Sequence, residues 1–330
     1  MSIPTPPAAT TVADVKGHTV RHFLSVDDVS SDELLALLDR ADELKAERAA
    51  RLRAGASLVG DELGGRSVAL VFEKPSLRTR ASFEVGVHEL GGTPLPMWDS
   101  EVGLGRRETV EDTGAVLGRY VHAIVVRTFG HQGLARLAEA AGVPVVNALT
   151  DHEHPCQALA DLQTFREVHG TFAGRVLTYV GDGNNVAHSL LLAGAKVGLS
   201  VRIAHPEGYA PDEQVVARAR DIAVATGAEV VTTTDPVAAV AGAHALYTDV
   251  WASMGQEDEA VERRRVFAPF QVTEQLLAAA DDDAVVLHCL PAHRGEEITA
   301  EVIDGSRSRI FDQAENRLHA QKALLATLLA

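Results

Sequence analysis

The segment FEKPSLRTRASFE (72–84) places two arginines and two hydroxyl residues in five consecutive positions, 76–80. The segment follows an apolar strand-like run and opens a helix-like one. Ser76 is therefore placed to cap a helix, whose first N–H groups and positive dipole end attract an anion. Arg78 and Thr79 add donors that suit the acceptor oxygens of a phosphate, so these three residues favour an anion site over a merely capped helix. For Arg80, further around the helix, a solvated side chain is an equally good interpretation.

Further polar residues follow two later strand-like runs. Arg127 ends the run HAIVVRT, and His154 and Gln157 come after PVVNAL. Ligands of open parallel sheets bind outside the carboxyl ends of the strands, so we expect these side chains to face the same crevice as Ser76. With Pro155 in the first helical turn, His154 and Gln157 lie three positions apart on one helix face. Both can therefore reach one small polar ligand.

The segment DHEHPCQ (151–157) contains several potential metal ligands, among them Asp151, His152, His154 and Cys156. Their alternating positions directly before a proline fit neither a closed zinc site nor an i, i+4 pair on a helix. We therefore expect no metal.

The segment YVGDGNNVAHS (179–189) imitates the first turn of a dinucleotide-binding fold, with Gly181 and Gly183 after a strand. The last glycine of that motif is missing, because its position holds Val186. A nicotinamide-dependent dehydrogenase is therefore only an alternative. The pair Asn184–Asn185 at a strand end suggests hydrogen bonding to a polar substrate, but a simple strand-to-helix turn accounts for Asn184 equally well.

Two more strand-like runs end in the segments DVWASMG and HCLPAHRGEE. The carboxylate of Asp249 could hold an ammonium group. Cys289 could contact a substrate or act as a nucleophile, but a nucleophilic thiol needs a neighbouring base. His288 falls on the opposite face if the strand continues, so we do not expect covalent catalysis. A buried cysteine that fills apolar space is the alternative for Cys289.

Strand-like and helix-like segments alternate along the whole chain. A helix is expected over 31–50 behind a Ser/Asp cap. Alternation of this kind predicts an α/β fold with two doubly wound domains, each with a central parallel sheet flanked by helices. The expected boundary lies near residues 150–155, and the final segment NRLHAQKALLATLLA is an apolar helix that needs a groove. The expected strands lie within 67–72, 122–129, 144–149, 175–182, 200–205, 243–250 and 284–290.

Size and charge narrow the class of protein. The 330 residues suit two α/β domains, and 46% hydrophobic with 23% charged residues is the profile of a soluble globular enzyme. A net charge of −16 argues against nucleic acid and anionic membranes as partners. No apolar stretch is long enough to span a bilayer, the opening residues do not resemble a signal peptide, and the two cysteines suit a reducing compartment. We expect a cytoplasmic protein.

Taken together, the segments resemble one enzyme family. FEKPSLRTR, RTFGH, HPCQALADLQT, GDGNN, DVWASMG, HCLPAHRGEE and AENRLH occur in the order found in ornithine carbamoyltransferases. The resemblance implies transfer of a carbamoyl group from carbamoyl phosphate to the δ-amine of L-ornithine, without metal or organic cofactor. It also implies a homotrimer or a multiple of trimers, a carbamoyl phosphate-binding domain over 1–150 joined by the C-terminal helix (about 314–330), and an ornithine-binding domain over 151–313.

The same resemblance implies a role for individual residues. The phosphate would be held by Ser76, Arg78, Thr79 and the backbone of Leu77, and Arg127 would bridge the phosphate and the carbonyl oxygen. His154 would support that oxygen, and Gln157 would receive the carbamoyl NH2 group. Ornithine would be bound at positions matching Asn185, Asp249, Ser253, Met254, Cys289 and Leu290, and Cys289, Leu290 and Arg317 would line the reacting centre.

Two positions depart from the pattern of the family. Leu77 stands where Thr or Gly is more usual, so that only its backbone can serve. Gly103 stands where several relatives place a polar residue that reaches a neighbouring subunit, and Arg106, Arg107 or no residue replaces it. The SMG turn after Asp249 favours free ornithine over aspartate, acetylornithine or putrescine as acceptor. A phosphate-ligand binding module without turnover is a further alternative.

Overall fold

The computed structural model describes residues 12–13, 19–252 and 257–330. The chain divides into two compact units, each considered by itself. The first unit contains Arg40–Cys156, Gln321–Ala330 and the chain up to Val29, and the second contains Ser30–Asp39 and Gln157–Ala320. The residues of α1 (Ser31–Arg53), α6 (Pro155–His169) and α13 (Ile310–Leu328) are shared between the two units.

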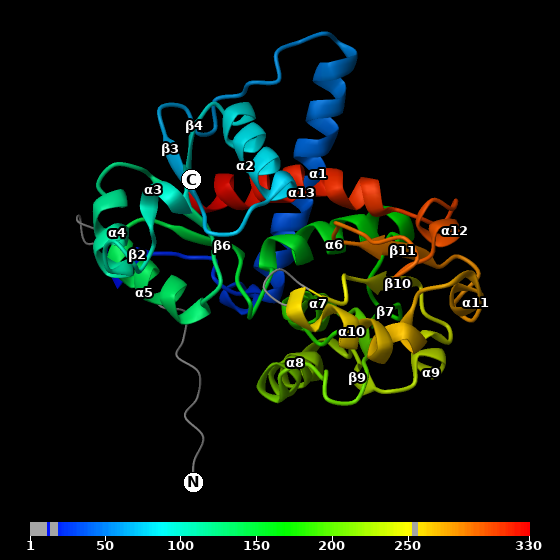
Figure 1. Cartoon of the computed structure of the whole chain (residues 1–330). Helices are drawn as coiled ribbons and strands as arrows, with labels where there is room; N and C mark the ends of the chain where they lie inside the picture. Colours follow the sequence, from blue (N-terminus) through cyan, green and yellow to red (C-terminus); the bar gives the residue numbers. More distant parts are fainter. Residues whose placement is uncertain (1–11, 14–18, 253–256) are drawn as a thin grey trace. The chain divides into compact units, whose positions relative to one another are not determined.

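The first unit is built on a parallel four-stranded sheet in the order β4-β3-β5-β6. Alternate residues of β3 and β5, such as Ala69 and Ile124, pack against the buried faces of α4 and α5, which lie side by side (Figure 1). The residues between them, such as Val68 and Val125, are also buried, so both faces of the sheet are covered. The strands are β3 (Ser67–Phe72), β4 (Thr93–Trp98), β5 (Ala123–Arg127) and β6 (Val145–Leu149), and the helices are α2 (Leu77–Glu89), α3 (Asp99–Val102), α4 (Val110–Leu117) and α5 (His131–Ala141).

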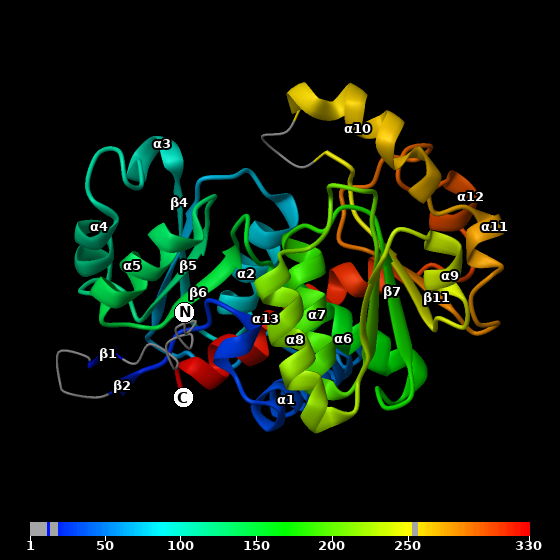
Figure 2. The same cartoon turned by 90° about the horizontal axis from the view of Figure 1, so that it is seen from below.

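The second unit contains a parallel five-stranded sheet in the order β11-β10-β7-β8-β9. One face packs Val180, Leu246 and Val286 into a core with Val302 and Ile303. Helices α7 and α8 lie side by side in this unit (Figure 2). The strands are β7 (Val176–Val180), β8 (Ser200–Ala204), β9 (Val230–Thr233), β10 (Ala245–Thr248) and β11 (Val285–His288), and the helices are α7 (Asn185–Val197), α8 (Glu213–Thr226), α9 (Pro236–Val240), α10 (Ala260–Phe267), α11 (Glu274–Leu277) and α12 (Ala300–Ile303).

The predicted α/β fold with two parallel sheets is confirmed. Each strand expected from the sequence forms within the expected range, but β4 and β9 were not expected. A short antiparallel pair, β1 (Val12–Ala13) with β2 (Thr19–Val20), was not expected either. Within the described residues, no helix has the length and hydrophobicity that crossing a bilayer would require.

The C-terminal helix is anchored in the first unit, as its apolar sequence requires. Ala323, Leu324 and Leu325 are buried. Lys322 donates from Nζ to Glu89 Oε2 at 2.9 Å, and both side chains are almost fully buried. An ion pair of this kind fixes the last turns of α13 against α2.

Candidate functional site

The N-terminus of α2 forms the first part of the site, in the first unit. Ser76 is the N-cap residue, in extended conformation, and its Oγ accepts a hydrogen bond from the Thr79 N–H at 3.2 Å. The predicted cap is therefore confirmed. Leu77 is 79% exposed, so its side chain is not part of a packed site. The N–H groups of this first turn are those that a helix leaves without intrahelical partners.

Arg127 approaches the same helix from the end of β5. In the sheet it pairs in register with Phe72, the last residue of β3, from which the chain leads into α2. Its Nη1 lies 3.5 Å from Thr79 Oγ1, although the two residues are 48 positions apart. Neighbouring parallel strands thus bring guanidinium and hydroxyl groups to one edge, as the carboxyl-end rule predicts. We call Ser76, Thr79 and Arg127, together with Arg78 in the same first turn of α2, the donor cluster.

A further basic residue of the same segment, Lys74, was not expected. It is 5% exposed, its Nζ lies 2.5 Å from Asp151 Oδ1, and it stands 4.0 Å above the centre of the Phe129 ring. The sequence held a signal for it, because Lys74 lies in the FEKPSLRTR segment. Its charge adds to those of Arg78 and Arg80 in the same segment, although Asp151 offsets part of it.

Arg80 is an exposed side chain, as in the solvated interpretation that the sequence left open, but it also has partners within the protein. Its Nε donates to Glu84 Oε1 at 2.6 Å, one turn along α2. Its guanidinium also lies 4.6 Å from the centre of the Trp98 ring, which is a cation–π contact. Arg80 therefore braces α2 against β4, and we leave it out of the donor cluster.

His154 directly precedes α6 and is 5% exposed. The loop before it is held by buried contacts: Thr150 N donates to Glu153 O at 2.9 Å, and Glu153 Oε2 accepts from Val26 N at 3.1 Å. His131 Nδ1 lies 3.1 Å from Thr150 Oγ1, and burial together with the charge of His152 lowers the pKa of His131 to about 4. The loop therefore keeps His131 neutral at physiological pH.

A second group of polar side chains is buried in the second unit, between α6 and α13. Gln157 is 2% exposed, and its Oε1 accepts from Arg317 Nη1 at 2.7 Å. Its Nε2 donates to Asp161 Oδ1 at 2.7 Å, and Gln313 Nε2 donates to the same oxygen at 2.6 Å. Gln157 and Arg317 were predicted site residues that meet here, whereas Asp161 and Gln313 were not expected.

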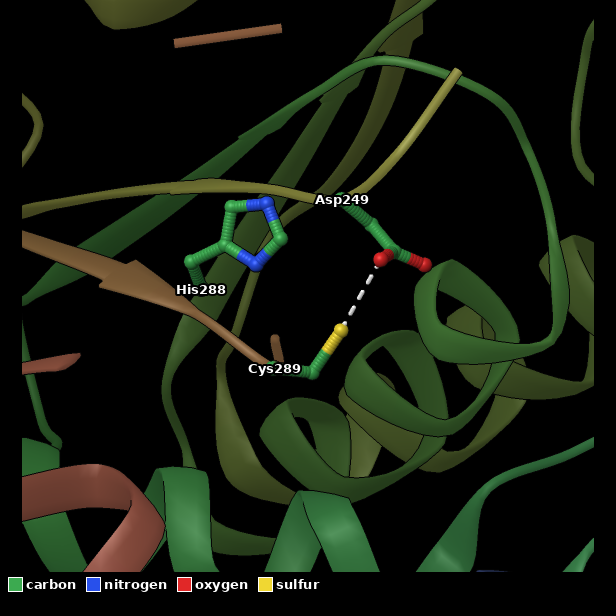
Figure 3. A group of neighbouring side chains, drawn as sticks. All are labelled: Asp249, His288 and Cys289. Atoms are coloured by element: carbon green, nitrogen blue, oxygen red, sulfur yellow. Dashed lines mark hydrogen bonds between the residues drawn. The ribbon is translucent and has the colours of Figure 1, made fainter. Parts of the chain in front are cut away.

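A carboxylate and a thiol meet at the ends of β10 and β11, as Figure 3 shows. Cys289 Sγ donates to Asp249 Oδ1 at 3.0 Å, and Asn184 Nδ2 donates to Asp249 Oδ2 at 3.0 Å. Asp249 also accepts from the Val250 N–H at 2.8 Å, so three donors hold a carboxylate that is 6% exposed. Cys289 is half-buried and bonded to a carboxylate, so it is more than an apolar filler. We call Asn184, Asp249 and Cys289 the acceptor cluster.

His288 lies nearer to Cys289 than expected. The strand was assumed to continue, but β11 ends at His288, and the chain turns at Leu290 with a φ of 60°. The side-chain ligand atoms of Asp249, His288 and Cys289 lie within 4.8 Å of one another (Figure 3). A histidine is therefore within reach of the thiol, and the expectation of an opposite face is wrong in this respect.

These three residues are also of the types that bind zinc. However, both ring nitrogens of His288 are already used: Nδ1 accepts from the Leu290 N–H at 2.8 Å, and Nε2 lies 3.2 Å from Glu297 Oε1. A metal ion would have to displace one of these bonds. Another group of potential ligands, around Glu297, consists of His293, Glu296 and Glu297.

The glycine-containing turn after β7 is occupied by its own side chains. Asn184 caps α7, and its Oδ1 accepts from the N–H groups of Val186 at 2.9 Å and Ala187 at 3.2 Å. Asp182 forms an ion pair with Arg263 at 2.7 Å. A dinucleotide needs the N–H groups of such a helix for its pyrophosphate. Asn184 takes two of these N–H groups at α7, whereas Ser76 takes only one at α2, so the turn after β7 is the poorer anion site and the dehydrogenase alternative is disfavoured.

The remaining expected positions are Asn185, Ser253, Met254 and the segment around Gly103. Asn185 is the first residue of α7 and half-buried. Ser253 and Met254 lie outside the described residues. In the segment around Gly103, Arg107 donates to Glu101 O at 2.7 Å, and Arg106 pairs with Asp99.

Comparisons with known proteins agree with the resemblance seen in the sequence. The family model "Aspartate/ornithine carbamoyltransferase, carbamoyl-P binding domain" matches residues 21–167, and the "Asp/Orn binding domain" model of the same family matches residues 173–328. An ornithine carbamoyltransferase of Parafrankia sp. is 60% identical, with 94% of this chain and 96% of the relative covered. One from Acidothermus cellulolyticus is 58% identical, with 94% and 97% covered.

Solved structures agree as well. The ornithine carbamoyltransferase from Pyrococcus furiosus matches with a TM-score of 0.88 at 49% identity, over 93% of this chain and 96% of that one. The enzyme from Gloeobacter violaceus matches with a TM-score of 0.82 at 51% identity, over 94% and 98%. The chain therefore belongs to the aspartate/ornithine carbamoyltransferase family of enzymes, and within it to the ornithine carbamoyltransferase group.

Proposed function

We propose that the chain transfers the carbamoyl group of carbamoyl phosphate to the δ-amine of L-ornithine, which gives L-citrulline and phosphate. The single observation that carries this proposal is the donor cluster, in which Arg127 meets Thr79 at the capped N-terminus of α2. The names of the relatives, all ornithine carbamoyltransferases, support the choice of substrates.

The phosphate group is proposed to sit at the N-terminus of α2. There the N–H groups of the first turn, the Ser76 hydroxyl and the guanidinium of Arg78 supply neutral and charged donors. Arg127 reaches from β5 toward the same turn, so one guanidinium can contact both a phosphate oxygen and the carbonyl oxygen of the donor. Arginine suits this bridging because its donors form a planar fork.

The carbonyl oxygen becomes negative as the amine attacks. Arg127, Thr79 and His154 are proposed to stabilise that charge, and donors fixed in advance do so without reorganisation. Gln157 is proposed to accept a hydrogen bond from the carbamoyl NH2 group. Its carbonyl oxygen already accepts from Arg317, which fixes the direction of the amide and leaves a second lone pair.

Ornithine is proposed to bind at the acceptor cluster. Asp249 carries the charge that an α-ammonium group needs, and Asn185, Cys289 and Leu290 are proposed to complete the contacts, together with Ser253 and Met254 outside the described residues. The Cys289 thiol donates to Asp249 and thereby helps to orient it. Both ring nitrogens of His288 are already hydrogen-bonded, so this histidine is not available as a base for the thiol. We therefore propose direct attack of the amine without a covalent enzyme intermediate.

The amine must lose a proton before it attacks. With a pKa near that of lysine, about 10.4, deprotonation at pH 7.4 costs about 4 kcal/mol. Alignment of two bound substrates can contribute about 7–11 kcal/mol. Positioning therefore exceeds the cost of deprotonation, and no cofactor is needed in this mechanism.

Several further features are proposed on the resemblance alone. They are a donor domain over 1–150 joined by residues 314–330, an acceptor domain over 151–313, a homotrimer or a multiple of trimers, a cytoplasmic location and a place in arginine metabolism. The division of α6 and α13 between the two compact units is compatible with C-terminal residues joining the first unit.

The proposal is tested by assaying citrulline or the corresponding product from carbamoyl phosphate. Ornithine, acetylornithine, putrescine and aspartate are offered separately as acceptors to the full-length protein. Turnover with ornithine alone is expected. Turnover with another acceptor only would move the protein to a different specificity within the family, and binding of carbamoyl phosphate without any turnover would identify a binding module.

A further inference from the structure

A buried carboxyl group on α6 binds two glutamine side chains at once. Asp161 lies one helical turn after Gln157 and is 1% exposed. Its Oδ1 accepts hydrogen bonds from Gln157 Nε2 at 2.7 Å and from Gln313 Nε2, on α13, at 2.6 Å. One oxygen atom therefore joins two helices through two amide groups.

The hydrogen bonds fix which way both amides point. Since Asp161 Oδ1 receives both NH2 groups, the two carbonyl oxygens point away from it. Gln157 Oε1 accepts from Arg317 Nη1 at 2.7 Å, and Gln313 Oε1 accepts from the His288 N–H at 2.8 Å. A guanidinium and a backbone N–H can only donate. Reversing either amide would therefore break bonds at both of its ends.

We propose that Asp161 is a positioning residue for carbamoyl transfer: by holding the NH2 group of Gln157, it keeps the Gln157 carbonyl oxygen in the orientation that accepts the carbamoyl NH2 group. The inference rests on the proposed function, in which Gln157 contacts the donor. An amide that turned by 180° would present NH2 to NH2, and two donors cannot bond to each other. Asp161 thus acts on the substrate through Gln157.

The second amide, that of Gln313, connects Asp161 to the strand that precedes the acceptor cluster. Gln313 holds the backbone N–H of His288, the last residue of β11, and Cys289 follows directly with its thiol on Asp249. The end of β11 is also held by its pairing with β10. Loss of Asp161 is therefore expected to affect use of carbamoyl phosphate more than use of ornithine.

Packing alone does not account for a carboxyl group at this place. Burial raises the pKa of Asp161 to about 7, even though the hydrogen bonds from Gln157 and Gln313 and the charge of Arg317 lower it. An apolar side chain of similar volume would avoid this desolvation. The carboxyl group is therefore explained by the hydrogen bonds that it accepts, which an apolar side chain could not make.

The test compares two substitutions of similar size in the full-length protein. Asp161→Asn retains an acceptor oxygen, and Asp161→Leu removes it. Citrulline formation gives kcat and KM for each substrate. For carbamoyl phosphate, Asp161→Asn is expected to keep kcat/KM within about threefold, because the acceptor is retained. Asp161→Leu is expected to lower it about 100-fold, the size of effect that a misplaced contacting group produces.

A matched control lies one turn further along α6. Thr164 is equally buried, and its hydroxyl bonds to Asn316 on α13 at 2.9 Å and to Ala160 O at 2.7 Å. Thr164→Val is expected to lower the melting temperature while kcat/KM for carbamoyl phosphate stays within about threefold, because Gln157 keeps its partners.

A double substitution separates positioning from general stability. If Asp161 acts through Gln157, then Asp161→Leu introduced into a Gln157→Leu protein lowers kcat/KM by no more than about twofold further, because the interaction is already gone. Independent effects would instead multiply. Where Asp161→Leu does not fold, Asp161→Ala replaces it with the same expectations.

The inference is overturned by full kcat/KM in folded Asp161→Leu, by a 100-fold loss in Asp161→Asn, or by losses that multiply in the double variant. A parent protein that forms no citrulline contradicts the proposed function itself. An active parent with an indifferent Asp161→Leu variant contradicts only the inference.

Discussion

Substitution of Asn184 separates two functions of one side chain in the second unit. Its Oδ1 caps α7 through the N–H groups of Val186 and Ala187, and its Nδ2 donates to Asp249 Oδ2 at 3.0 Å. Serine caps a helix about as well as asparagine but has no NH2 group to reach the carboxylate. Asn184→Ser therefore removes the Asp249 contact and keeps a cap, whereas Asn184→Ala removes both.

The expected loss of stability follows from these contacts. A hydrogen bond to a charged group contributes about 1.5–3 kcal/mol, and an N-cap contributes about 1 kcal/mol. Water replaces the lost donor poorly, because Asp249 is 6% exposed. We expect Asn184→Ser to lower the free energy of unfolding by about 1.5–3 kcal/mol, and Asn184→Ala to lower it by about 1 kcal/mol more.

The expected kinetic effect is specific to ornithine. Without Asn184, Asp249 keeps its bonds from Cys289 and from the Val250 N–H, both on Oδ1, and loses the one on Oδ2. Its carboxylate can then rotate away from the geometry proposed for the α-ammonium group. We expect KM for ornithine to rise about 10- to 100-fold, at about 1.4 kcal/mol per tenfold. KM for carbamoyl phosphate should change less than about threefold, because the donor cluster is untouched.

Urea denaturation followed by circular dichroism gives the stability of each variant, and citrulline formation gives both KM values. An unchanged KM for ornithine in Asn184→Ser, despite the expected loss of stability, would leave Asn184 as a turn residue only and refute the reasoning. An equal rise in both KM values would indicate a general distortion instead of a contact to Asp249.

Three further outcomes test the donor cluster, the fold and the chemistry. Arg78→Ala should raise KM for carbamoyl phosphate at least about tenfold in a protein that stays folded, and Arg80→Ala, its matched control, should change KM less than about twofold. Lys322→Met should lower the free energy of unfolding by about 3–5 kcal/mol in urea titrations, because Glu89 stays buried with one cation fewer. Burial raises the pKa of Glu89, but the bonds from Lys322 and Arg48 bring it below the ordinary value; its contribution to stability is therefore present at neutral pH and lost as the pH falls through the folded pKa. Melting temperatures across acid pH should show this loss, and Glu89→Gln should reduce the slope. Finally, kcat/KM for ornithine should rise from about pH 6 to pH 9 as the δ-amine loses its proton, and a flat profile would contradict attack by the neutral amine.

Apart from the short β1–β2 pair, the strands that the sequence did not reveal lie at the edges of the two parallel sheets. β4 reads TPLPMW, and its prolines at positions 94 and 96 cannot donate to a ladder. An edge strand tolerates this because it pairs on one side only, here with β3. β9 is a four-residue strand at the edge of the other sheet. The interior strands β3 and β5, by contrast, are runs of mostly apolar residues buried on both faces, which is the pattern that the sequence displays.

Contacts between polar residues could be predicted where strand order or helical spacing determines them. Arg127 meets Thr79 because β5 and β3 are neighbours and both segments leave the same edge of the sheet. Asp161 stands four residues after Gln157, a spacing that indicates a contact on one face of a helix. Gln313 lies 152 residues from Asp161 and carries no local signal, so only the folded chain reveals that contact.

The sequence presented a strand-to-helix turn and hydrogen bonding to a substrate as alternatives for Asn184, but the structure shows a helix cap that links the two. A side chain that is to orient a carboxylate must itself be held in one rotamer, and the cap provides that restraint. The same logic applies to Gln157, whose amide is fixed by Asp161 at one end and by Arg317 at the other. Residues that hold the fold together are therefore the ones best able to place a neighbouring group within a fraction of an ångström. For Asn184 and Gln157, a structural role and a role in positioning a substrate-binding group are therefore two effects of the same hydrogen bonds.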